Sequence, residues 1–124
     1  MYIYHYSNKD IQDKIKAKFF GENFFSSHSK KVSSIKRSFF YLDKKRREPY
    51  FFGSKFLYTA IISEDKIYSV NNDILGIFEN NSGNVSECLR LIKKAGYIGF
   101  SGSNGIKNVC LLVDITFINK EILN

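Results

Sequence analysis

The sequence contains few of the residues that mark linkers and metal sites. It has no tryptophan and a single proline, Pro49, which argues against long proline-rich spacers. Its two cysteines, Cys88 and Cys110, lie far apart, and neither has a histidine nearby in a zinc-binding spacing. Because their neighbours are apolar, we expect both thiols to be buried and reduced, and we expect no metal site.

Long hydrophobic runs and targeting signals are also missing. No segment approaches the roughly 18 apolar residues that a membrane-spanning helix needs. The N-terminus lacks the basic and then apolar pattern of a signal peptide. The phosphate-binding glycine loops of nucleoside triphosphatases and Rossmann proteins are absent from the sequence. The expectation is a cytoplasmic protein without membrane contact.

The sequence does contain enough apolar material for one core. Of its 124 residues, 44% are hydrophobic and 25% are charged, which is the usual balance of a globular protein. Aromatic residues are frequent, at 16% of the chain. We expect a single domain over residues 1–118, followed by a C-terminal tail over residues 119–124.

Positive charge is concentrated in the first half of the chain. The net charge is +7, and residues 1–55 hold 13 of the 19 Lys and Arg residues but only 5 of the 12 Asp and Glu residues. The run Lys44–Arg47 is the densest cluster. Such a distribution suits a polyanionic partner, which could be a dinucleotide, a nucleic acid or an acidic protein surface. A solvated basic face that keeps the protein soluble is the alternative interpretation.

Hydrophobic periodicity predicts a mixed α+β domain of about five to seven strands with two or three helices. The clearest helix covers residues 84–95, because Asn84 and Glu87 form a capping pair and Gly96 is placed to end it. Residues 109–113 are apolar on both faces, which is typical of a central buried strand. The remaining predicted elements are strands over 2–6, 37–42, 55–63, 66–70 and 97–100, a helix containing Ile11, Ile15 and Phe19, and a short helix capped at residues 71–73.

Two of these predictions concern connections. The strands over 55–63 and 66–70 are separated by Glu64 and Asp65, which predicts an antiparallel hairpin. Residues 21–34 are rich in Ser, Asn and Gly, with Phe24 and Phe25 among them, and predict a long loop.

Three segments, taken in order, carry a family resemblance. They are Tyr2–Ser7, with His5 near the end of a first strand, Arg37–Leu42, and Ala95–Phe100, which contains Gly96, Tyr97 and Gly99. Together they resemble small bacterial and phage-borne proteins of the ADP-ribosyltransferase fold, in the class that uses a His-Tyr-Glu set. The resemblance implies an α+β fold with a split antiparallel β-sheet core and two or three helices, and NAD as substrate.

The resemblance also implies roles for individual residues. His5 would contact a ribose hydroxyl, and the backbone of Tyr6 and Ser7 would hold the carboxamide. Arg37 would meet the pyrophosphate. Either Phe40 or Tyr41 would stack on the nicotinamide, and because neighbours on a strand point to opposite faces, only one of them can. Tyr41 is slightly favoured because Phe39 shares its face.

This sequence differs from the family at the acidic residue of the His-Tyr-Glu set. Relatives have an acidic residue where this chain has Ile98, and the strand over 107–114 starts without the glutamate of that class. Glu87 could supply the acidic group, although helix capping explains it equally well. The candidate catalytic residues are therefore His5, Tyr41 and Glu87.

Two functions follow as expectations. The first is an NAD-dependent ADP-ribosyltransferase, or an NAD glycohydrolase, that acts as a bacterial or phage effector, toxin or anti-defence protein on a macromolecular target. Lys44–Arg47 and the loop with Phe24 and Phe25 would then select that target. The second is an inactive binding module of the same fold, which blocks a nucleic acid or a nucleic-acid-binding complex through its basic aromatic half.

Overall fold

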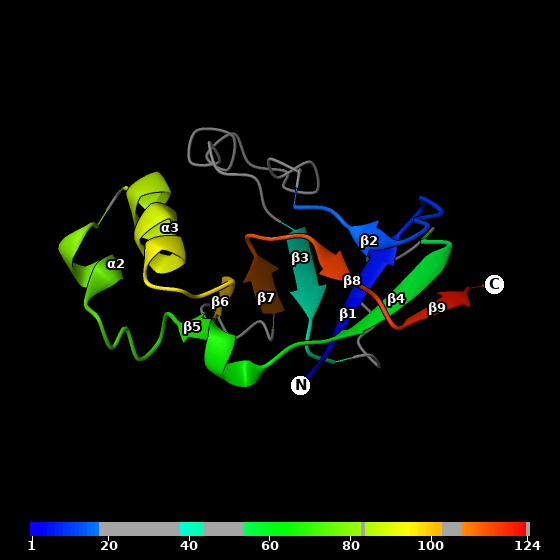
Figure 1. Ribbon diagram of the computed structural model, residues 1–124, viewed down its shortest axis with the longest axis horizontal. Helices are drawn as coiled ribbons and strands as arrows, with labels where there is room; N and C mark the ends of the chain where they lie inside the picture. The colour runs from blue at the N-terminus through cyan, green and yellow to red at the C-terminus, as the bar shows by residue number, and fades with distance from the viewer. Residues whose placement is uncertain (18–37, 44–53, 83, 103–107, 124) are drawn as a thin grey trace.

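The computed structural model describes residues 1–17, 38–43, 54–82, 84–102 and 108–123. Within these residues the protein is a mixed α+β fold built on a seven-stranded sheet, with strand order β5-β6-β7-β3-β1-β4-β9, and a two-stranded sheet, β2-β8 (Figure 1). The strands are β1 (Tyr2–Ser7), β2 (Lys14–Ile15), β3 (Ser38–Tyr41), β4 (Phe56–Ile61), β5 (Ile67–Ser69), β6 (Gly99–Ser101), β7 (Asn108–Leu111), β8 (Ile115–Thr116) and β9 (Asn119–Ile122). The helices are the 3-10 turn η2 (Glu64–Lys66), α2 (Ile77–Asn80) and α3 (Val85–Lys94).

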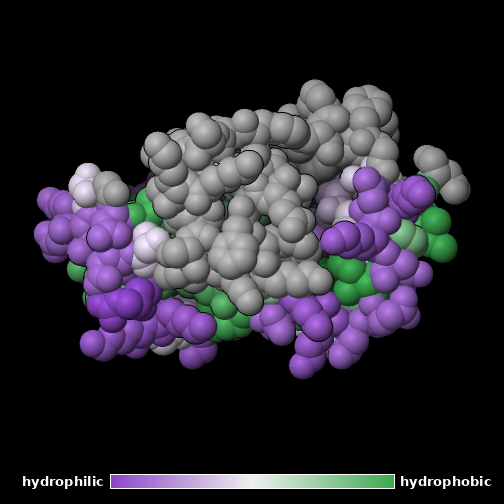
Figure 2. Space-filling view, turned by 90° about the horizontal axis from the view of Figure 1, so that it is seen from above, coloured by the Kyte–Doolittle hydropathy of each residue, from purple (hydrophilic) through white to green (hydrophobic). Residues whose placement is uncertain are grey.

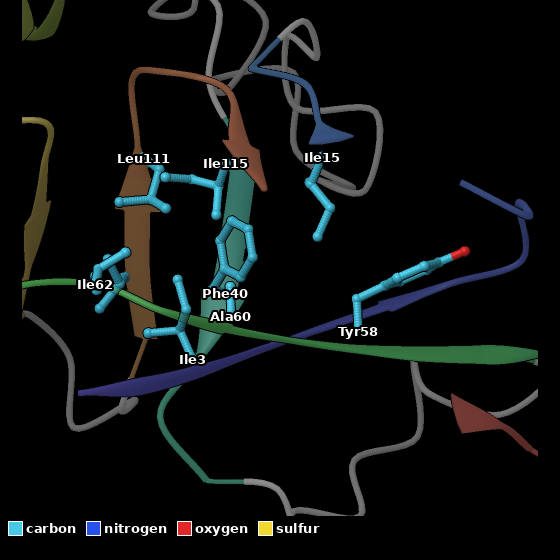
Figure 3. Packing of buried hydrophobic residues seen from close by; sticks show 9 residues of the cluster. Ile3, Ile15, Phe40, Tyr58, Ala60, Ile62, Leu111 and Ile115 are labelled. Carbon is cyan, nitrogen blue, oxygen red and sulfur yellow. The ribbon is translucent and has the colours of Figure 1, made fainter. Parts of the chain in front are cut away.

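One face of the large sheet carries the main core. Side chains alternate along each strand, so Ile3 of β1, Phe40 of β3 and Ala60 of β4 share this face. Ile15 and Ile115 of the small sheet pack onto it, and Figure 3 shows them pointing toward Phe40. We call this surface the core face.

Among the described residues, helices cover the opposite face of the sheet at its β5–β6 end. Tyr68 of β5 and Phe100 of β6 point to this side, where they pack with residues of α2 and α3. The buried members of this second cluster are Tyr68, Ile77, Cys88, Leu89, Ile92 and Leu112. Both cysteines are buried and neither forms a disulfide, as expected. No helix in the described ranges is long and apolar enough to cross a membrane.

Helix α3 forms where the sequence predicts it. The Asn84 side chain accepts a hydrogen bond from the Glu87 backbone N–H at 3.1 Å, which satisfies one of the unpaired donors of the first turn. At the other end Gly96 has a φ of 96°, and the N–H groups of Gly96 and Tyr97 bond back to the carbonyls of Lys93 and Ile92. The prediction of β7 as a buried strand is also confirmed, since Val109, Cys110 and Leu111 are all buried.

The helix predicted after the first strand is wrong. Residues 8–13 are irregular, and Ile15 pairs with Ile115 in the small sheet instead. The buried Tyr58 hydroxyl accepts a hydrogen bond from the Ile11 N–H and donates one to the Lys9 carbonyl. These two bonds take backbone groups that a helix would have used, so tertiary contacts override the local periodicity.

Two further predictions are corrected by strand pairing. The predicted hairpin does not form, because η2 turns the chain away and β5 pairs in parallel with β6. Residues 119–122, expected in a tail, form the edge strand β9 against β4. The short helix expected from residues 71–73 begins later, at Ile77.

Asp73 organises the chain between β5 and α2. Its φ of 41° lies in the left-handed region, which residues other than glycine seldom adopt. Its carboxylate accepts hydrogen bonds from the N–H groups of Phe78 at 3.2 Å and Glu79 at 2.9 Å, and from the Tyr68 hydroxyl. The Tyr68 bond is the main reason that the pKa of Asp73 lies below its ordinary value.

The lowered pKa of Asp73 predicts an acid-sensitive contribution to stability. Because the carboxyl titrates lower in the folded protein than in the unfolded chain, its contribution is complete above its ordinary pKa of 3.8 and is lost as the pH falls through the folded value. We expect Asp73→Asn to be less stable at neutral pH and to lose less stability on acidification than the wild type.

Urea unfolding between about pH 3 and pH 7 measures this difference. Asp65→Asn is the matched control, because Asp65 is exposed and its carboxylate bonds only to the nearby Ser63 hydroxyl among the contacts described. A wild-type pH dependence in Asp73→Asn would show that Asp73 makes no such contribution.

Candidate functional site

His5 is held in one orientation by a backbone group of the neighbouring strand. Its Nδ1 lies 2.7 Å from the carbonyl oxygen of Phe39, and because a carbonyl can only accept, Nδ1 carries the proton. Burial lowers the pKa of His5, and the bond to Phe39 opposes this shift. The neutral ring therefore presents Nε2 as a hydrogen-bond acceptor.

The sheet is loosely joined at this point. Strand β1 pairs with β4 along its whole length, from Tyr2↔Ile61 to Ser7↔Phe56, but its register with β3 is limited to Tyr4↔Tyr41. Next to that pair, the Phe39 carbonyl bonds to the His5 imidazole. Between β1 and β3, the His5 side chain therefore bonds to a backbone carbonyl close to the point where backbone hydrogen bonds of an antiparallel ladder would continue.

A cavity of about 490 Å³ lies beside His5. This volume is in the range of small-molecule sites, roughly 300–1,000 Å³. Ser7, which points to the same face of β1 as His5, also lines it. The other described lining residues come from the irregular segment after β1, and they are Lys9, Asp10, Ile11, Gln12, Asp13, Lys14, Ile15 and Lys16.

The segment that lines the cavity is anchored at several points. The Tyr58 hydroxyl bonds to Lys9 and Ile11, and Asp10 forms an ion pair with Lys120 of β9. At its far end the Ala17 N–H donates to the Asp114 carboxylate at 2.9 Å. The Asp114 carboxylate therefore has a structural partner in this segment. Sequence reasoning missed this segment by assigning it to a helix, although Asn8 and Asp10 are typical turn residues.

The two aromatic candidates are on opposite faces of the sheet. Phe40 lies on the core face with its ring centroid 5.2 Å from that of His5, but its side chain is fully buried. Tyr41 lies on the other face, where its ring is edge-on to that of Tyr6 at 6.2 Å. The structure therefore separates Tyr41 from His5, which corrects the expectation that the two form one catalytic set.

Glu87 is not brought to His5 either. It lies in the first turn of α3, which packs on the opposite face at the β5–β6 end of the sheet (Figure 1). Its carboxylate accepts a 2.9 Å hydrogen bond from the Arg90 Nε, and this bond lowers the pKa of Glu87. These contacts within the first turns of α3 give Glu87 a structural role at the start of the helix. Arg37, Lys44–Arg47 and the loop with Phe24 and Phe25 lie outside the described residues.

The described residues include no cluster of three or more histidine, cysteine, aspartate or glutamate side chains that could hold a metal ion. Comparisons with protein-family models, curated proteins and solved structures found no match to this chain. The fold and the cavity define a mixed α+β protein with a histidine where β1 meets β3, beside a cavity whose described lining consists mainly of charged and polar residues.

Proposed function

We propose that this protein binds NAD in the cavity beside His5 and cleaves it, transferring ADP-ribose to a macromolecular target, as a bacterial or phage effector would. The observation that carries the proposal is the His5 imidazole, fixed by the Phe39 carbonyl and presenting Nε2 beside a cavity that Ser7 also lines. The resemblance of residues 2–7 to the first strand of ADP-ribosyltransferases supports the choice of ligand.

The chemistry needs the groups that line this cavity. Cleavage of the nicotinamide–ribose bond passes through a state with positive charge at the anomeric carbon, so the ribose must be held in one orientation. A neutral Nε2 accepts a hydrogen bond from a ribose hydroxyl. Lys9, Lys14 and Lys16 bring positive charge to the place where the diphosphate would lie.

The role of the acidic residue changes in this proposal. Glu87 belongs to a helix start, whereas two carboxylates line the cavity itself. Asp10 is paired with Lys120, and Asp13 is exposed. We therefore assign the acidic function to Asp13. No residue is assigned to stack on the nicotinamide, because the Phe40 side chain is fully buried in the core.

The test is nicotinamide release from NAD, measured with and without host lysate, alongside NAD binding by calorimetry. The variant His5→Asn is the sharpest, because its amide can still donate to the Phe39 carbonyl while the Nε2 acceptor is removed. We expect it to lose about 100-fold or more of the release rate, and thermal unfolding checks that the variant is folded. In the wild type, acidification should weaken NAD binding at a lower pH than the ordinary histidine pKa of 6.5 would give, since burial lowers the pKa of His5.

The matched controls are Glu87→Gln and Tyr41→Phe, which should release nicotinamide at the wild-type rate. Asp13→Asn should slow release while NAD still binds. Release that requires lysate indicates transfer to an acceptor, and release without lysate indicates hydrolysis. Failure of the wild type to bind NAD, or full activity in His5→Asn, would falsify the proposal.

The inactive binding module is the second candidate. It is favoured by the separation of His5, Tyr41 and Glu87, which leaves the family's catalytic set unassembled. In that case the protein binds a nucleic acid or a nucleic-acid-binding complex. Its affinity for a nucleic acid falls steeply with salt, and His5→Asn does not change that affinity.

A further inference from the structure

Two large aliphatic side chains are exposed side by side just before α2. Ile74 is 79% exposed and Leu75 is 54% exposed. The coloured surface in Figure 2 is mostly hydrophilic, with smaller hydrophobic areas. Adjoining exposed aliphatic residues on such a surface mark candidate contact sites.

The backbone holds these two residues in place. Asp73 and Gly76, on either side of them, both adopt left-handed conformations, with φ of 41° and 64°. The Leu75 N–H donates to the Tyr68 hydroxyl at 3.1 Å, and the Gly76 N–H donates to the Asp73 carbonyl at 2.8 Å. A strained and hydrogen-bonded turn therefore fixes Ile74 and Leu75 in their exposed positions.

A hollow lies next to the exposed pair. It has a volume of about 390 Å³ and is lined by residues of the turn, α2 and α3. Leu75, Ile77, Leu91 and Ala95 give it an apolar floor, with Asn80 and Asn81 beside them. Lys94 is the only charged residue among the described ones that line it.

We propose that this hollow, with Ile74 and Leu75 at its edge, is a docking surface for a protein segment that carries an aliphatic or aromatic anchor next to a carboxylate. The anchor would fill the hollow against Leu75 and Leu91, and the carboxylate would pair with Lys94. The occupant is not a second copy of this chain, because an identical surface has no acidic residue among the described ones that line the hollow, and so offers Lys94 no carboxylate to pair with. The proposal uses none of the residues assigned to NAD and does not depend on it.

Selection of random dodecapeptides displayed on phage against the wild-type protein, without NAD, tests this surface. We expect the enriched peptides to share an aliphatic or aromatic residue adjacent to Asp or Glu. Synthetic versions should bind in fluorescence anisotropy, and Leu75→Ser and Lys94→Glu should each weaken that binding about tenfold or more. Lys94→Glu should regain affinity for peptides in which Lys replaces the acidic residue.

Ile122→Ser is the control, because Ile122 is 71% exposed on β9, the strand at the opposite edge of the sheet from β5. Its peptide binding should equal that of the wild type. The proposal is overturned if no peptide is enriched over a Leu75→Ser bait, or if the peptides bind both substituted proteins as tightly as the wild type. A dimer in sedimentation that Leu75→Ser dissolves would also overturn it, in favour of self-association. Thermal unfolding confirms that each variant is folded.

Discussion

Gly99→Ala is expected to destabilise the fold by about 3 kcal/mol or more, since overpacking a tight interior site has costs of this order. A Cβ atom at this position would lie 2.3 Å from the Cys110 carbonyl oxygen and 2.8 Å from Leu111 Cδ2. Strand β6 is hydrogen-bonded to β5 on one side and to β7 on the other, so it cannot shift to relieve the contact.

Gly96→Ala is the matched control for this prediction. Gly96 has a φ of 96°, but apart from Gly96 and its two chain neighbours no atom of the described residues lies within 4 Å of the place where its Cβ would be. Its substitution introduces backbone strain alone, at about 1–2 kcal/mol. Urea unfolding of the two variants compares the cost of the steric clash at residue 99 with the cost of backbone strain at residue 96. Equal losses of unfolding free energy would show that the sheet adjusts around residue 99.

Tyr58→Ala is the second substitution with a large expected effect. The Tyr58 ring is fully buried and lies 4.8 Å from that of Phe117 and 6.4 Å from that of His5. Removal of a large buried aromatic side chain leaves a cavity and costs about 3–5 kcal/mol. It also releases the segment that lines the cavity beside His5, so under the proposed function the affinity for NAD should fall together with stability.

Tyr58→Phe separates these two effects. The ring remains, but the Ile11 N–H and the Lys9 carbonyl lose their partner, at a cost of about 1–3 kcal/mol. Hydrogen exchange at the Ile11 amide should accelerate more than exchange in β4. Tyr2→Phe, at a side chain that is 59% exposed, should change stability by less than about 0.5 kcal/mol. Unchanged exchange at Ile11 in Tyr58→Phe would mean that the hydroxyl does not anchor the segment.

The candidate site was predictable only in part. The sequence pointed to His5 and Ser7, and side-chain alternation required that Phe40 and Tyr41 point apart. It favoured Tyr41 as the residue that accompanies His5, and this was wrong because the choice depends on the register between strands far apart in the chain. The register Tyr4↔Tyr41 answers this, since it puts Phe40 beside His5 and Tyr41 on the other face.

Sequence alone determined the elements whose signals are local. Asn84, Glu87 and Gly96 specify the ends of α3 through hydrogen bonds within a few residues, and the apolar run at 109–113 identifies a strand buried on both faces. The tertiary structure alone decided which strands pair and what the irregular segments do. Strand β5 joins β6 in parallel, and the Tyr58 hydroxyl holds residues 9–11 out of a helix. These outcomes depend on contacts between residues far apart in the sequence, whose burial outweighs the weak preferences of each segment by itself.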